Sequence, residues 1–67
     1  MNTNLLKAKM AEYSDTQADL AAAIGISASN LNAKLNGKVS FRQNDIAAIR
    51  TQYNLSAEEV DRIFFAQ

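Results

Sequence analysis

The sequence predicts an all-α fold built from five short helices. The 67 residues include twelve Ala and no Pro; Ala has the highest helix propensity, whereas Pro breaks helices. No alternating run of β-branched residues, the usual sign of a strand, occurs in the chain. A chain of this length supplies one small hydrophobic core, so we expect residues 1–67 to form one domain.

The composition argues against an enzyme and against a metal or cofactor site. The chain has no Cys and no His, which removes disulfides, thiolate ligands, and the commonest general base and metal ligand. The carboxylates of Glu58, Glu59 and Asp61 are explained by their place at the start of a helix, where negative charge is favourable. The chain has no signal-peptide pattern and no membrane-length apolar run, so we expect a cytoplasmic protein without a membrane partner.

Two helices are expected before residue 25. The first covers Asn4 to Tyr13, with Thr3 as its candidate cap and with Leu6 and Met10 facing the core. The second covers Gln17 to Ile24. At its start, a capping box joins two side chains, with Asp in place of the usual Glu: Thr16 and Asp19.

The third helix follows the second after a tight turn. Gly25 comes directly after the last apolar residue, where the chain needs a left-handed conformation that Gly adopts cheaply. Ser27 is placed to cap a helix that ends at Leu35, and Ile26 with Leu31 forms its hydrophobic staple. Two short helices joined in this way are the pattern of a DNA-binding helix-turn-helix.

Two further helices are expected after the Asn36-Gly37 break. The fourth ends near Tyr53 and buries Ile46 and Ile49. Three starts remain open: a cap at Ser40 with Gln43 in a capping box, a cap at Arg42, or a cap at Asn44. For the fifth helix, the capping box is Ser56 with Glu59, and the staple is Leu55 with Val60.

These residues resemble the Cro and repressor DNA-binding domains of temperate phages, within the xenobiotic-response-element class of regulators. The match is carried by Thr16 to Ala21, Gly25-Ile26-Ser27, Leu31 and Asn36-Gly37-Lys38. The tail, Asn54 to Phe65, resembles the last helix of small Cro-like regulators from phages of Gram-positive bacteria. The resemblance implies a lambda-repressor-like fold and a phage or prophage repressor that binds palindromic operators.

The outward face of the third helix is the candidate for reading bases. Its side chains are short and uncharged, which suits a helix that enters the major groove. An Asn side chain can bind adenine in a bidentate manner, and an Ala methyl can pack on a thymine methyl. The candidate base contacts are Ala28, Ser29, Asn32 and Ala33. The alternative is an ordinary solvated helix face.

Polar and basic residues around this face are the candidates for phosphate contacts. The resemblance assigns such a contact to Gln17. The remaining candidates are Ser27, Asn30, Lys34, Asn36, Lys38 and Arg42. Capping alone also explains Ser27. Many relatives have an apolar residue at the position of Lys34, and here we expect Leu35 to be buried instead.

The net charge is zero, but the charges are unevenly distributed. Residues 27–53 carry a net charge of +3, whereas residues 1–26 carry −1 and residues 54–67 carry −2. A basic surface normally supplies much of the affinity of a DNA-binding protein. The positive segment contains the proposed reading helix, so we expect an oriented molecule with modest affinity.

The C-terminal aromatic pair predicts a contact between copies of the chain. Phe64 and Phe65 are adjacent, so one helix face cannot bury both. Either the last turn covers both rings, or Ile63, Phe64 and Phe65 form the contact of a weak homodimer that assembles mainly on DNA. Two alternative functions remain: an antitoxin or restriction–modification controller of the same fold, and a helical protein-interaction module without DNA binding.

Overall fold

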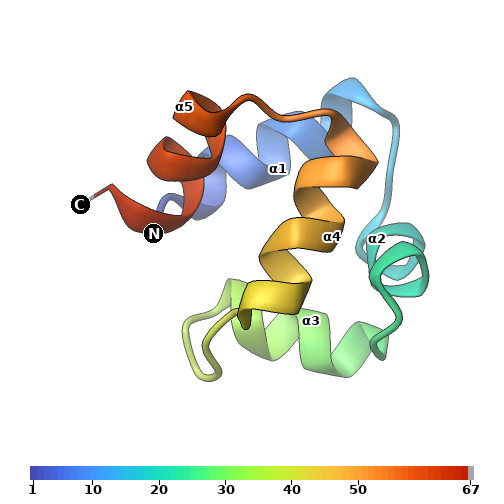
Figure 1. Ribbon diagram of the computed structural model, residues 1–67. Coiled ribbons are helices and arrows are strands. Elements are labelled where there is room, and N and C mark those ends of the chain that lie inside the picture. The colour runs from blue at the N-terminus through green and yellow to red at the C-terminus, as the bar shows by residue number, and fades with distance from the viewer. Residues whose placement is uncertain (67) are drawn as a thin grey trace.

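The computed structural model describes residues 1–66. All of the regular secondary structure in these residues is helical. The helices are short and fold into a compact body of 27 × 24 × 20 Å, as expected for an all-α chain (Figure 1). In chain order the elements are α1 (Thr3–Glu12), α2 (Gln17–Ile24), α3 (Ala28–Leu35), α4 (Gln43–Tyr53), α5 (Ala57–Val60) and the π-helical turn η1 (Asp61–Phe65).

The turn between α2 and α3 has the conformation that the sequence predicts. Gly25 has φ +79°, in the left-handed region that disfavours side chains. The next amide, that of Ile26, donates to the Ala21 carbonyl at 3.0 Å and closes the end of α2. Ser27 Oγ then accepts from the Asn30 amide at 3.0 Å and starts α3. These local bonds set where α2 ends and where α3 begins. The two helices pack directly on each other.

Helix α1 starts one residue before the predicted position. Asn2, rather than Thr3, caps it, because Asn2 Oδ1 accepts from the Leu5 amide at 3.2 Å. The Thr3 hydroxyl instead donates to the Leu35 carbonyl at 3.4 Å. The Thr3 side chain, which the sequence predicts as a cap, therefore bonds to the end of α3 instead.

Helix α4 starts at the second of the three predicted caps. Arg42 is the N-cap, and its backbone amide donates to Asp45 Oδ2 at 2.9 Å. The Ser40 capping box does not form, because the helix begins at Gln43, after the Arg42 cap. The Ser40 carbonyl accepts from the Lys34 ammonium. The helix ends at Asn54, which has φ +50°, a conformation that Asn tolerates better than most residues.

The C-terminal helix changes winding partway along. Ser56 and Glu59 form the predicted capping box of α5, with bonds of 3.0 and 3.1 Å. The chain then widens into η1, where the Ala66 amide donates to the Asp61 carbonyl. The Asn2 amide donates to the Ile63 carbonyl at 2.7 Å, which holds the start of the chain beside η1 (Figure 1).

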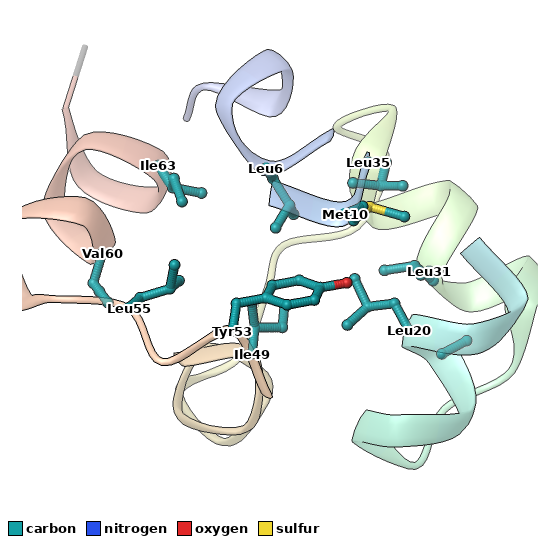
Figure 2. Packing of buried hydrophobic residues seen from close by; sticks show 11 residues of the cluster. Leu6, Met10, Leu20, Leu31, Leu35, Ile49, Tyr53, Leu55, Val60 and Ile63 are labelled. Carbon is teal, nitrogen blue, oxygen red and sulfur yellow. The ribbon is translucent and has the colours of Figure 1, made fainter. Parts of the chain in front are cut away.

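The core joins side chains from every helix. Figure 2 shows the Tyr53 ring among the leucine and isoleucine side chains of the cluster. The Tyr53 hydroxyl donates to Asp15 Oδ2 at 2.9 Å, and Tyr13 donates to the Tyr53 carbonyl at 3.0 Å. Burial and the Asp15 contact raise the pKa of Tyr53. Ile49 is fully buried as predicted, whereas Ile46 is half-buried at the edge of the core.

Candidate functional site

The predicted reading face of α3 is mostly open to solvent. Ala28, Ser29 and Asn32 are exposed, and Ala33 is half-buried. The opposite side of the helix contributes Leu31 to the core with no exposed surface. The Ser27 cap and the packing on α2 thus present a row of short, uncharged side chains to solvent.

Most of the predicted phosphate contacts lie around this face. Gln17, the first residue of α2, is half-buried. The exposed candidates are Ser27, Asn30, Asn36, Lys38 and Arg42. The Lys38 amide donates to the Ala33 carbonyl at 2.9 Å, so the α3–α4 loop, residues 36–42, folds back on the end of α3. Within residues 1–66, no acidic side chain lies in ion-pair contact with Lys38 or Arg42.

Lys34, which the sequence predicts as a phosphate contact, does not lie with this group on the surface. Its side chain is 3% exposed, and its Nζ lies 2.8 Å from Asp45 Oδ2 and 3.1 Å from the Ser40 carbonyl oxygen. Leu35 is buried beside it, so α3 buries both positions rather than Leu35 alone. An ammonium held in the interior in this way cannot reach a phosphate without breaking both contacts.

Asp45 is the residue of this region that sequence reasoning missed. Burial raises the pKa of its carboxyl, but the hydrogen bonds from Lys34 and from the Arg42 amide lower it by more, so the net pKa lies below the usual value. Asp45 is therefore ionised at neutral pH and carries the counter-charge of Lys34. The sequence held a signal for its partner only. Lys34 follows Leu31 by three residues, a spacing that places Lys34 on the buried face of α3.

The predicted self-association residues separate into three environments. Ile63, a predicted contact between copies, is 2% exposed and packs in the core rather than on the surface. Phe64 is half-buried and packs edge-to-face on Phe41, with ring centroids 5.4 Å apart. Phe65 is 62% exposed. The winding of η1 thus buries one residue, half-buries the next and leaves the third in solvent.

Phe65 belongs to an apolar hollow beside the α3–α4 loop. The hollow has an empty volume of about 600 Å³. Met1 and Val39 line it together with Phe41 and Phe64, and both Met1 and Val39 are nearly half exposed. An apolar surface therefore adjoins the loop that carries Lys38 and Arg42.

Some of the remaining charges are paired and others are free of ion pairs within residues 1–66. Lys9 pairs with Glu59 at 2.6 Å and with Glu12 at 3.5 Å, and Arg62 lies 3.8 Å from Glu58. Since Lys34 and Asp45 neutralise each other, the positive charge of residues 27–53 is carried by side chains exposed to solvent: Lys38, Arg42 and Arg50.

Residues 1–66 lack two further classes of site. No group of three or more acidic side chains lies close enough together to hold a metal ion. In the same part of the chain, no helix combines the length and the apolar character needed to cross a membrane.

The fold and this surface define a small all-helical protein with an exposed polar helix beside a basic loop. The chain belongs to the family described as "Protein of unknown function (DUF739)", whose model matches residues 2–67. Comparison with curated proteins and with solved structures found no match.

Proposed function

We propose that the protein is a sequence-specific regulator of transcription that binds double-stranded operator DNA, as a Cro-like phage or prophage repressor. In this proposal α2 and α3 form a lambda-repressor-like helix-turn-helix, and α3 is the reading helix. The observation that carries the proposal is the exposed row of short polar side chains on α3, held between two capped turns.

Base reading is assigned to the exposed side chains of α3. Asn32 supplies an amide for bidentate contact with adenine, and Ser29 supplies a hydroxyl. Ala28 supplies a methyl group for thymine. Ala33, which is half-buried, contributes at the edge of this surface.

Phosphate binding is assigned to the residues around α3. Lys38 and Arg42 supply charge from the loop, and Gln17 approaches from the start of α2. Ser27, Asn30 and Asn36 supply short polar groups at the two ends of α3. The two cations, Lys38 and Arg42, make only a small electrostatic contribution to affinity. Each phosphate contact changes the slope of log affinity against log salt concentration by only about one unit.

A second copy of the chain is the proposed protein partner. One domain reads few base pairs, and two copies on a palindromic site add their contacts, with half-sites about 34 Å apart or a multiple of that distance. Phe65 and Val39 supply exposed apolar surface for this contact. The dimer is expected to be weak in solution and to form mainly on DNA.

The test is a binding titration of the unmodified protein over a range of salt concentrations, with operator sequences obtained by selection from random duplexes. A DNA-binding regulator gives one enriched sequence and a steep loss of affinity with salt. The exposed apolar hollow and the zero net charge favour a second candidate, a protein-interaction module. That candidate predicts no enriched sequence and no salt-dependent DNA binding.

A further inference from the structure

One buried ion pair has no part in the proposed DNA contacts. Lys34 lies in the last turn of α3 and Asp45 in the first turn of α4, and both side chains are removed from solvent. The Lys34 ammonium also lies 5.8 Å from the centre of the Phe41 ring. One side chain of α3 thus contacts the α3–α4 loop and the helix that follows it.

The second half of this loop depends on that cluster. The first half is held to α3 by backbone bonds, since the Lys38 and Val39 amides donate to the Ala33 carbonyl. From Ser40 to the Arg42 amide, the hydrogen bonds found within residues 1–66 are two: Lys34 Nζ to the Ser40 carbonyl, and the Arg42 amide to Asp45 Oδ2. Both bonds involve a member of the ion pair.

Stability alone does not account for the pair. Removing two charges from water costs free energy that their attraction and hydrogen bonds offset only in part, and neutral replacements of similar size are often as stable. The pair instead ties α3 to the loop and to α4, because a buried charge is costly to separate from its partner.

We propose that Lys34 and Asp45 are positioning residues, which fix the second half of the α3–α4 loop against α3 and so place Arg42 for phosphate contact. This inference rests on the proposed function. The sequence predicts that Lys34 contacts phosphate directly. In this proposal the buried Lys34 side chain instead positions a residue that does so. Its effect on binding is therefore independent of DNA sequence.

The test uses the full chain with Lys34→Met and Asp45→Asn combined. Met fills a similar volume, and the Asn oxygen can still accept from the Arg42 amide, while the net charge stays at zero. The matched control is Glu58→Gln with Arg62→Met, which removes an exposed pair between α5 and η1 without changing the net charge. If circular dichroism shows the first variant unfolded, Lys34→Gln with Asp45→Asn replaces it.

Two measurements are made on each protein: amide hydrogen exchange, and affinity for a short random-sequence duplex over a salt series. In the positioning variant, we expect the Arg42 amide to exchange about tenfold faster, because its hydrogen bond then goes to a neutral side chain. We expect the salt slope to fall by about one unit per lost contact. Adding Arg42→Ala should lower the slope in the wild-type background and change it little in the variant. The control should match the wild type.

The outcomes separate this inference from the function on which it rests. Unchanged exchange, or an unchanged slope with a full Arg42→Ala effect in the positioning variant, overturns the positioning role while leaving DNA binding intact. Wild-type protein that shows no salt-dependent binding overturns the proposed function, and the positioning role falls with it.

Discussion

Lys9 of α1 and Glu59 of α5 form an ion pair that joins the two ends of the chain, with 2.6 Å between Nζ and Oε2. The hydrogen bond from Lys9, followed by that from the Ser56 amide, lowers the pKa of Glu59 to about 2. The same contact with Glu59 raises the pKa of Lys9. Both charges are therefore present throughout the neutral range.

This pair predicts a specific acid sensitivity. The Glu59 pKa is lower in the folded chain than its ordinary value of 4.5, so its contribution to stability is present above about pH 4.5 and is lost as the pH falls toward 2. Urea unfolding should show wild-type protein more stable than Glu59→Gln at pH 7, with the difference vanishing near pH 2. Gln keeps the capping bond, so the difference reports the charge. Glu58→Gln, at an exposed site, is the control, and a pH-independent difference for Glu59→Gln would contradict the prediction.

The loop between α1 and α2 contains a strained residue. Ser14 has φ +57°, a conformation that costs a residue with a side chain more than it costs Gly. Ser14→Gly should raise the free energy of unfolding by about 0.5–1 kcal/mol, which corresponds to roughly 2–8 °C in melting temperature for a domain of this size. Asn54→Gly provides the comparison, since Asn54 has φ +50° but tolerates it better, and its gain should be smaller. A loss of stability in Ser14→Gly would contradict this account.

Asn32 is the sharpest test of base reading. Asn32→Ala should weaken binding to the selected operator by about 1–3 kcal/mol and relax preference at one or two base positions. Folding should be unaffected or slightly improved, because Ala has the higher helix propensity and the site is exposed. Gln52→Ala, on the exposed part of α4, is the control. Retention of both affinity and selected sequence by Asn32→Ala would exclude this residue from the reading surface.

Lys38 and Arg42 should contribute affinity without specificity. Replacing either with Ala should weaken binding to all duplexes about equally and lower the salt slope by roughly one unit. Arg62→Ala removes the same charge from η1 and should leave the slope unchanged. The measurement is a titration of operator and random duplexes at several salt concentrations. Slopes identical to the wild type in both loop variants would remove the loop from the phosphate contacts.

Phe65 should affect assembly rather than folding. Phe65→Lys should keep the helical content, because the side chain is largely exposed. It should make operator binding weaker and less steep with protein concentration, although the added positive charge by itself favours DNA binding. Leu5→Lys adds the same charge at another exposed apolar site, on α1, and is the control. Titration of one-half-site and two-half-site duplexes, with sedimentation of the free protein, measures the effect. Equal affinity of the wild type for both duplexes, with one chain bound to each, would leave the dimer without support.

The sequence by itself determined the helices and the turns between them. The Thr16–Asp19 and Ser56–Glu59 boxes, the Ser27 cap and the left-handed Gly25 are all present. Each depends on atoms within a few residues of one another, so the local residue pattern specifies it without reference to the rest of the chain.

Tertiary structure decided which side chains remain on the surface. The ion pair of Lys34 with Asp45 spans eleven residues, the bond from Thr3 to Leu35 spans thirty-two, and Ile63 enters the core only because η1 packs on α1. Helical periodicity predicts the direction in which each side chain points, but it does not identify the residue that the side chain contacts. A lysine on a buried helix face needs a carboxylate close enough to form an ion pair. Whether Asp45 lies that close to Lys34 depends on how α3 and α4 pack.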